Sequence, residues 1–322
     1  MNEDYLWDRS GPPDAEIERL ERTLAPLRYR HRADLLHAAH TAPRRWWAVA
    51  AAAIVVVAAA LEMRTPPPPA TAWQVDSVHG QASLGSQQAA VSMSLRAGQT
   101  ARTGADTEMT LRADQFGTVL IGPDSELRAA TNRHIELQHG LLHAYIWAPP
   151  RQFVVDTPSA RAVDLGCEYT ITVDASGDGL LRVSLGWVAF QNGDREVFIP
   201  AGAACVTRKR LGPGIPFYED ASEALRRSLE AFEQGDASAL AGILSNTRPS
   251  DGLTLWHLLT RVAERDRGRV FDRFAVLIAL PKEVRREDVL RRDPHSIDLC
   301  WDALNLENTE WWRGWEARWG SS

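Results

Sequence analysis

The stretch GCEYTITVDASGDG, residues 166–179, decides the fold class of the central part of this chain. Tyr169, Ile171 and Val173 alternate with polar residues, which is the pattern of a β-strand that buries one of its faces. The polar run that follows this strand predicts a hairpin turn. We therefore expect an antiparallel pair of strands at this point of the chain.

The residues on both sides of this stretch extend the same pattern. Leu181, Val183 and Leu185 continue the alternation on the returning strand, and Gly186 interrupts it, which predicts a bulge or a bend. On the other side, short apolar runs begin at Trp73 and are separated by Gly, Pro, Asn and Asp about every ten residues. This punctuation is typical of an all-β domain, which we expect over residues 75–212.

Past residue 216 the apolar period changes to that of helices. Leu225, Leu229 and Phe232 share one face of a segment that Asp220 or Ser222 caps. A C-terminal all-α domain is therefore expected over residues 219–320. Its further helices are predicted at residues 236–244, with Asp236 as N-cap, and at 254–264, 267–280, 286–292, 294–304 and 309–319.

The apolar segment RRWWAVAAAAIVVVAAALEMRTPPPP, residues 44–69, admits three interpretations. Ala, Val and Ile on every face argue against a buried helix of a globular domain, and the long preceding segment argues against a cleavable secretion signal. An uncleaved single-pass transmembrane helix over residues 44–64 remains, and the arginines before it predict a cytoplasmic N-terminus. The prolines after it predict a stiff extended linker over residues 65–74.

Composition excludes some classes of protein. A hydrophobic content of 44% and a charged content of 24% are ordinary for globular domains, and a net charge of -6 gives no basic surface for nucleic acid. The three cysteines, Cys167, Cys205 and Cys300, all follow the predicted span. A disulfide between Cys167 and Cys205 and a pair of buried free thiols are both compatible with the sequence.

The first 43 residues contain one helix signal. Asp14 is a candidate N-cap, and the apolar residues that follow it recur at helical spacing until Pro26 breaks the helix. So short a helix frays alone, so it either folds on a partner or belongs to a disordered tail. The predicted partner-binding residues of this inner segment are Tyr5, Leu6, Trp7, Ile17, Leu20 and Leu24.

No catalytic residues, cofactor or metal ligands are predicted. Asp156 lies in FVVDTPSA, where Pro158 replaces the glycine of an aspartic-protease loop. The run from Asp174 to Gly179 matches half of a calcium loop, but Leu185 replaces the required glutamate. The histidines of residues 134–143 lack zinc-protease spacing, and phosphate-loop and dinucleotide fingerprints are missing from the sequence. The protein is therefore not expected to be an enzyme.

Residues 75–210 resemble the periplasmic domain of FecR-like membrane regulators, the anti-sigma factor family that controls extracytoplasmic-function sigma factors. The resemblance lies in the order of motifs, each a strand with its turn. The motifs are LRAGQTARTG at residues 95–104, MTLRADQFGTVLIGPDSEL at 109–127, IELQHGLLHAYI at 135–146, FVVDTP at 153–158, AVDLGCEYTITV at 162–173, VSLGWVAF at 183–190 and IPAG at 199–202.

The resemblance implies a multidomain α+β, membrane-anchored protein. The resemblance adds a single transmembrane helix and an all-β FecR-like domain, built as a sandwich or roll, to the short N-terminal helix within residues 1–43 and the C-terminal helices that the local patterns predict. It implies an inner-membrane regulator that relays an envelope signal to an extracytoplasmic-function sigma factor, with the C-terminal bulk in the periplasm. Its partners would be that sigma factor, an unknown envelope partner or ligand, and membrane lipid. The alternative is a membrane-tethered periplasmic binding or scaffolding protein without sigma-factor control.

Overall fold

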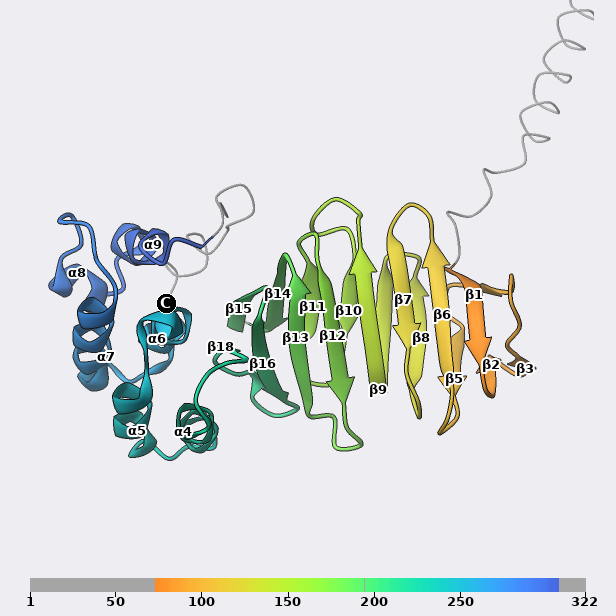
Figure 1. Ribbon diagram of the computed structural model, residues 1–322, viewed down its shortest axis with the longest axis horizontal. Coiled ribbons are helices and arrows are strands. Elements are labelled where there is room, and N and C mark those ends of the chain that lie inside the picture. Colours follow the sequence, from red (N-terminus) through yellow and green to blue (C-terminus); the bar gives the residue numbers. More distant parts are fainter. Residues whose placement is uncertain (1–72, 194, 307–322) are drawn as a thin grey trace, which may run out of the picture. The chain divides into compact units, whose positions relative to one another are not determined.

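The computed structural model describes residues 73–193 and 195–306. The chain divides into two compact units, Met1–Pro66 and Pro67–Ser322, and all the described residues belong to the second unit. The predicted N-terminal helix, the inner partner-binding residues and the segment 44–64 lie outside the described residues. In the described ranges, β-sheet dominates and helices follow it toward the C-terminus (Figure 1).

The predicted fold class requires a correction. None of the helices in residues 73–193 and 195–306 is long and apolar enough to cross a membrane. In these ranges the fold is a β part followed by a helical part, and the single transmembrane helix of the prediction is not among the described helices. The α+β composition of the prediction is otherwise what these residues show.

The strands form two layers that share one long strand. In the first sheet the neighbours are, in order, β4 (Ser94–Leu95), β1 (Trp73–His79), β6 (Glu108–Ala113), β7 (Gly117–Ile121), the second half of β9 (His134–Ile146), β12 (Glu168–Val173), β13 (Gly179–Leu185) and β16 (Ala203–Arg208), which also pairs with β17 (Gly212–Pro213) and β18 (Phe217–Tyr218). In the second sheet they are β3 (Gln87–Gln88), β2 (Ala82–Leu84), β5 (Thr100–Thr103), β8 (Glu126–Thr131), the first half of β9, β10 (Val154–Asp156), β11 (Arg161–Asp164), β14 (Trp187–Asn192) and β15 (Arg195–Pro200). These pairs are antiparallel except β9 with β10, which is parallel.

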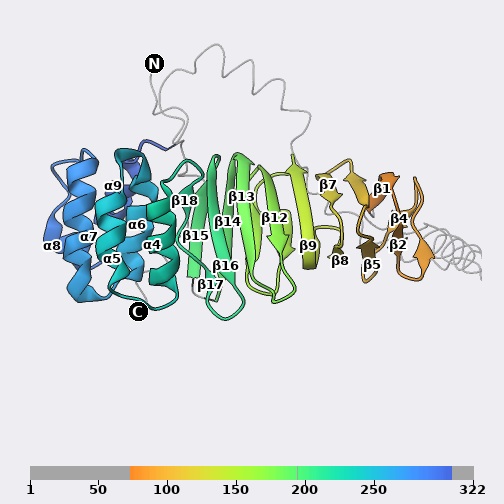
Figure 2. The same cartoon turned by 60° about the horizontal axis from the view of Figure 1, so that its bottom comes forward.

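Glycines mark the points where the chain passes from one sheet to the other. Gly140 divides β9 into its two halves and has a φ of 98°, a conformation that side chains with a Cβ rarely adopt. Gly186 separates β13 of the first sheet from β14 of the second and has a φ of 70°. A Cβ at Gly186 would overlap the Gly166 carbonyl oxygen. The predicted bend at Gly186 is therefore confirmed. Figure 2 labels β13 and β14, the strands that this bend separates.

The core lies between the two layers and follows the alternation in the sequence. Tyr169, Ile171 and Val173 are buried on the inner face of β12, as predicted, and the hairpin to β13 is confirmed. The expectation for Leu185 is wrong, because this side chain is 55% exposed. The register of β12 against β13 shifts at Glu168, and the shift places Leu185 opposite Glu168 on the outer face.

Helices complete the described chain, and several match the predicted ranges within a few residues. The Ser222 hydroxyl caps α4 by accepting a hydrogen bond from the Leu225 N–H. The predicted N-cap at Asp236 is wrong, because Ser238 occupies that position of α5. The helices are α4 (Glu223–Glu233), α5 (Ala239–Asn246), the short 3₁₀ helix η3 (Pro249–Asp251), α6 (Gly252–Arg261), α7 (Glu264–Leu277), α8 (Arg286–Leu290) and α9 (Pro294–Asp302).

Aromatic side chains join α6 and α9 to the second sheet. The Trp301 ring of α9 lies 4.7 Å from that of Trp256 in α6, 5.7 Å from Trp187 in β14 and 6.1 Å from Phe198 in β15, measured between centroids. All four rings are buried. Their burial removes a large apolar area from water, so α6 and α9 share one core with β14 and β15.

Candidate functional site

The predicted inner partner-binding residues cannot be placed, since Tyr5, Leu6, Trp7, Ile17, Leu20 and Leu24 lie outside the described residues. The site that the described residues form instead is a cavity of about 570 Å³ where the last strands meet the helices. This volume is in the range of small-ligand pockets. Its lining residues are Gly202, Tyr218, Glu219, Asp220, Pro249, Ser250, Gly252, Leu253, Ile278, Leu304 and Leu306.

One wall of this cavity is fixed by an arginine held between two aspartates. The Arg248 guanidinium donates to Asp251 at 3.0 Å and to Asp220 at 3.1 Å. Asp251 is completely buried and also accepts the Arg248 backbone N–H at 2.7 Å. Asp251 first, and Asp220 second, raise the pKa of Arg248 above its ordinary value. The three side chains tie η3 to the segment after β18 and so set the width of the cavity.

The chemistry of the lining favours binding over bond breaking. The lining includes apolar leucine and isoleucine side chains, and its polar side chains come from Tyr218, Glu219, Asp220 and Ser250. Burial, and then the Asp220 carboxylate, raise the pKa of the Tyr218 hydroxyl, so it stays protonated near neutral pH. Glu219 pairs with Arg182 of β13 at 3.1 Å. The cavity suits an apolar group that carries a hydrogen-bond donor toward the acidic rim.

The cysteines are separate and unreactive in the structure. Cys167, Cys205 and Cys300 are all buried and free in the structure. The disulfide between Cys167 and Cys205, one of the two alternatives, stays a prediction. Burial raises the pKa of the Cys167 and Cys205 thiols well above the ordinary value. A thiol that stays protonated is a poor nucleophile and a poor metal ligand.

A buried acid that the sequence analysis missed lies beside Cys167. The Asp164 carboxylate accepts a hydrogen bond from the Cys167 thiol at 2.5 Å and one from the Gly166 N–H at 2.8 Å. Burial raises the pKa of Asp164 to about 6. Asp164 is fully buried. In the sequence it lies inside the run AVDLG, and an acidic residue within such an apolar run was the signal that could have revealed it.

Two acids near the motifs singled out in the sequence have structural partners: Asp156 contacts His134 and Arg161, and Asp174 closes a hairpin turn. His134 Nε2 lies 2.7 Å from Asp156, whose other oxygen accepts from the Arg161 Nε at 2.7 Å. The Asp174 carboxylate closes the hairpin turn by accepting from the Ser176 and Asp178 N–H groups. Within residues 73–193 and 195–306 we find no group of three His, Cys, Asp or Glu side chains that could hold a metal ion.

Comparisons with known proteins give matches to solved structures, two of which are described below. No family model and no curated protein matches the sequence. Two of the solved chains that match are each described as "a putative anti-sigma factor" from Parabacteroides distasonis ATCC 8503. The first has a TM-score of 0.34 and 16% identity, and the match covers 42% of this chain and 65% of that chain. The second has a TM-score of 0.33 and 15% identity, and covers 46% and 73%.

Proposed function

We propose that this protein is a regulator of the FecR-like kind that acts by binding an extracytoplasmic-function sigma factor. In this proposal the β part and the adjoining helices receive a signal, and the N-terminal residues 1–43 contact the sigma factor. The observation that carries it is that every motif of the FecR-like resemblance contributes to a strand of the two-layered β part, in order from β4 to β15. The protein acts by binding and not by catalysis.

The proposed sigma-factor contact is the apolar stripe Ile17, Leu20 and Leu24, together with Tyr5, Leu6 and Trp7. A short amphipathic helix that buries such a stripe in a groove of a partner gains most of its affinity from the few residues at the centre of the contact. Leu20 occupies the middle of the stripe. We therefore choose it for the test.

Leu20→Asp in the full-length protein should weaken sigma-factor binding by about 1 to 3 kcal/mol, because it places a charge in an apolar groove. Glu18→Asp, on the polar side of the same helix, is the matched control and should change little. Binding is measured by pull-down against the sigma factor encoded nearest to the gene, and sigma-dependent transcription is read in parallel. Wild-type protein that neither binds the sigma factor nor changes its transcription contradicts the proposal.

A second candidate function is a binding or scaffolding protein without sigma-factor control. The observation that favours it is the cavity of about 570 Å³ beside Asp220 and Leu253, which could hold part of a ligand or partner. Deletion of residues 2–27 separates the two functions. The scaffold keeps its activity after this deletion, whereas the regulator loses transcriptional control.

A further inference from the structure

Two aromatic side chains at the end of β9 are exposed together. Tyr145 is 45% and Trp147 is 43% exposed, and both rank among the large apolar side chains that the described residues leave to solvent. Their ring centroids lie 5.8 Å apart with an angle of 64° between the planes. Since exposed aromatic rings cost free energy in water, a pair held together on the surface suggests a contact surface.

The Trp147 ring is held rigidly in this position. Its Nε1–H donates to the Asp114 carbonyl oxygen at 2.9 Å, and its backbone N–H donates to the Phe116 carbonyl oxygen at 2.9 Å. The Arg112 guanidinium lies 5.9 Å from the ring centroid and pairs with the Asp114 carboxylate at 2.8 Å. A ring fixed in this way loses little conformational entropy when a ligand packs against it.

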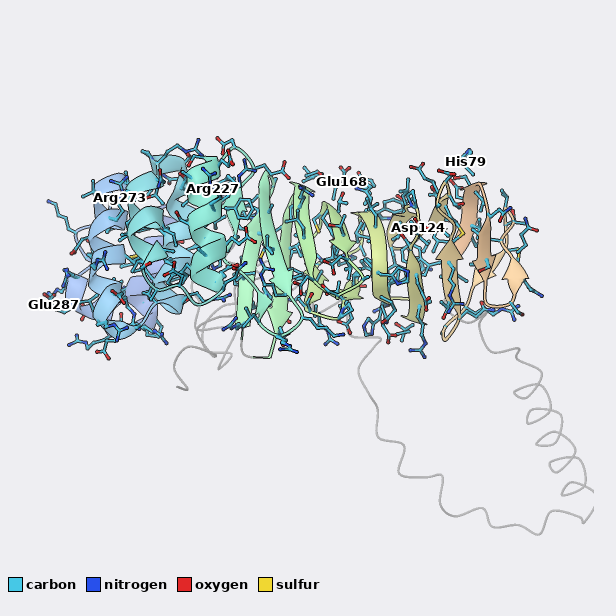
Figure 3. All side chains as sticks on the ribbon, turned by 90° about the horizontal axis from the view of Figure 1, so that it is seen from below. His79, Asp124, Glu168, Arg227, Arg273 and Glu287 are labelled. Carbon is cyan, nitrogen blue, oxygen red and sulfur yellow. The ribbon has the colours of Figure 1, made fainter. Side chains whose placement is uncertain are left out.

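The neighbours of the pair form a row across the outer face of the first sheet. Strand register places Gln74 opposite Arg112, Arg112 opposite Thr118, and Thr118 opposite Tyr145. The row continues from Tyr145 to Glu168, which Figure 3 labels on the surface of the β part. Aromatic rings with hydroxyl and guanidinium donors beside them are the surfaces that bind polyproline II helices, because such a helix presents apolar rings and carbonyl oxygens without N–H groups.

A proline run lies close to this surface along the chain. Pro67, Pro68 and Pro69 precede β1 by a few residues, and β1 places Gln74 beside Arg112, the residue that covers Trp147. Five extended residues from position 69 to Gln74 reach up to about 17 Å. Gln74 and Tyr145 are three strand positions apart, which is about 14 Å at the usual strand spacing. The tether is therefore long enough, and it keeps the prolines at an effective concentration in the millimolar range.

We propose that Tyr145 and Trp147, with Arg112, form a polyproline II binding surface and that its occupant is the proline run 67–69 of the same chain. The proline rings pack on the two aromatic rings. The Tyr145 hydroxyl and the Arg112 guanidinium donate hydrogen bonds to the proline carbonyl oxygens.

The test is tryptic cleavage after Arg64, which lies three positions before Pro67, in the full-length protein. The released fragment that begins at Thr65 is followed by mass spectrometry. Trp147→Ala should speed this cleavage about fivefold or more, because it releases the segment that the protease must bind in extended form. Replacement of Pro67, Pro68 and Pro69 by serine should speed it equally, and the combined variant should be no faster than either one.

Val276→Ala, at an exposed position of α7, is the control and should leave the rate within twofold. Tyr145→Ala serves as the second surface variant, and thermal unfolding verifies that each variant keeps the fold. Unchanged cleavage in both aromatic variants overturns the proposal, as do rate increases that multiply in the combined variant. Binding of an added decaproline peptide to wild-type protein, with cleavage unchanged in the aromatic variants, also overturns it, since the occupant is then another chain.

Discussion

Asp164 occupies an unusual position for a carboxylate, because it lies fully inside the β part with a thiol among its donors. A buried carboxylate without a cationic partner is held in the charged form only by its hydrogen bonds. Those from Cys167 and Gly166 lower its pKa, but burial has the larger effect and raises it. The proton on Asp164 therefore contributes to stability within a defined pH range.

Asp164→Asn tests this contribution. The pKa of Asp164 is about 6 in the folded protein against an ordinary value of 3.8, so the folded state holds a proton that the unfolded state has released. The stabilisation from this proton is complete below pH 3.8 and is lost as the pH rises through about 6, about 3 kcal/mol in all. Wild-type stability should thus fall relative to the asparagine variant over this interval, as measured by urea unfolding. Parallel pH profiles for the two proteins would contradict the burial of a titrating carboxyl.

Gly186→Ala should destabilise the protein strongly, because the new Cβ overlaps the Gly166 carbonyl oxygen and the φ of 70° disfavours alanine. The matched control is Gly85→Ala, which has a φ of 61° and no atom within 4 Å of the new Cβ. The control should lose only about 1 kcal/mol of folding stability, the cost of placing alanine at a positive φ. Thermal unfolding of both variants measures the difference, and equal losses would mean that the close approach at Gly186 does not matter.

At the scale of elements, the Trp301 side chain packs α9 against the β part. Trp301 contacts rings from β14, β15 and α6, and the Trp256 Nε1–H in α6 donates to the Ile297 carbonyl oxygen of α9 at 3.0 Å. The helices depend on this contact because they are short and gain little stability alone.

Trp301→Ala should cost about 3 to 5 kcal/mol, the usual range for removing a buried tryptophan. Amide exchange should rise first in α6 and α9, next to the cavity that forms, while β6 and β7 stay protected. Val276→Ala on α7, which is 75% exposed, is the control and should change stability by less than about 0.5 kcal/mol. Uniform exchange across all elements would show that the two parts unfold only together.

The elements that the sequence predicted well are those with local signals. The alternation of β12, the bend at Gly186 and the Ser222 cap each depend on neighbouring residues, and all three are confirmed. Leu185 was misplaced because a register shift against β12 turns it outward, and the shift depends on a strand pairing that periodicity does not reveal. The parallel pairing of β9 with β10, the cavity beside Asp220 and the contact of Asp164 with Cys167 were not predicted either. Each depends on contacts in space that periodicity does not reveal.

At the scale of the molecule, a histidine lies where the helices meet the strands. His257 of α6 is fully buried, with its Nε2 at 3.3 Å from the Phe198 carbonyl oxygen of β15. Burial first, and the Arg261 charge second, lower the pKa of His257 to about 3. The imidazole is therefore neutral in the folded protein near neutral pH and donates to Phe198 as the Nε2–H tautomer.

Acid should loosen the junction between the helices and the strands. Because the folded pKa of His257 is about 3 and the ordinary value is 6.5, its contribution to stability is complete above pH 6.5. It falls by about 1.4 kcal/mol for each pH unit below that value. His257→Gln keeps a donor but does not titrate, so its stability should decline less between pH 6.5 and 4. A decline of equal slope in both proteins, followed by urea unfolding, would assign the acid sensitivity to other groups.

Some predictions concern the molecule as a whole and stay predictions. Localisation in the bacterial inner membrane, the sigma-factor contact of residues 1–43 and the absence of enzymatic activity all depend on residues or partners outside the described ranges. The predicted domain boundaries, residues 75–212 for the β domain and 219–320 for the helical domain, also stay predictions. Localisation and domain boundaries can be predicted from a sequence because charge and hydropathy are local properties. Contacts with a partner cannot be predicted in this way, because they depend on the surface of the partner.

The strand β9 is hydrogen-bonded into both layers, and this has a mechanical consequence. Its first half pairs with β8 and β10, and its second half pairs with β7 and β12. Neither layer can slide along the strand direction without dragging the other, because a one-residue slip would break the ladder on both sides of Gly140. A pull applied to one layer is thus transmitted through the ladder hydrogen bonds to β9 and along its backbone to the opposite layer.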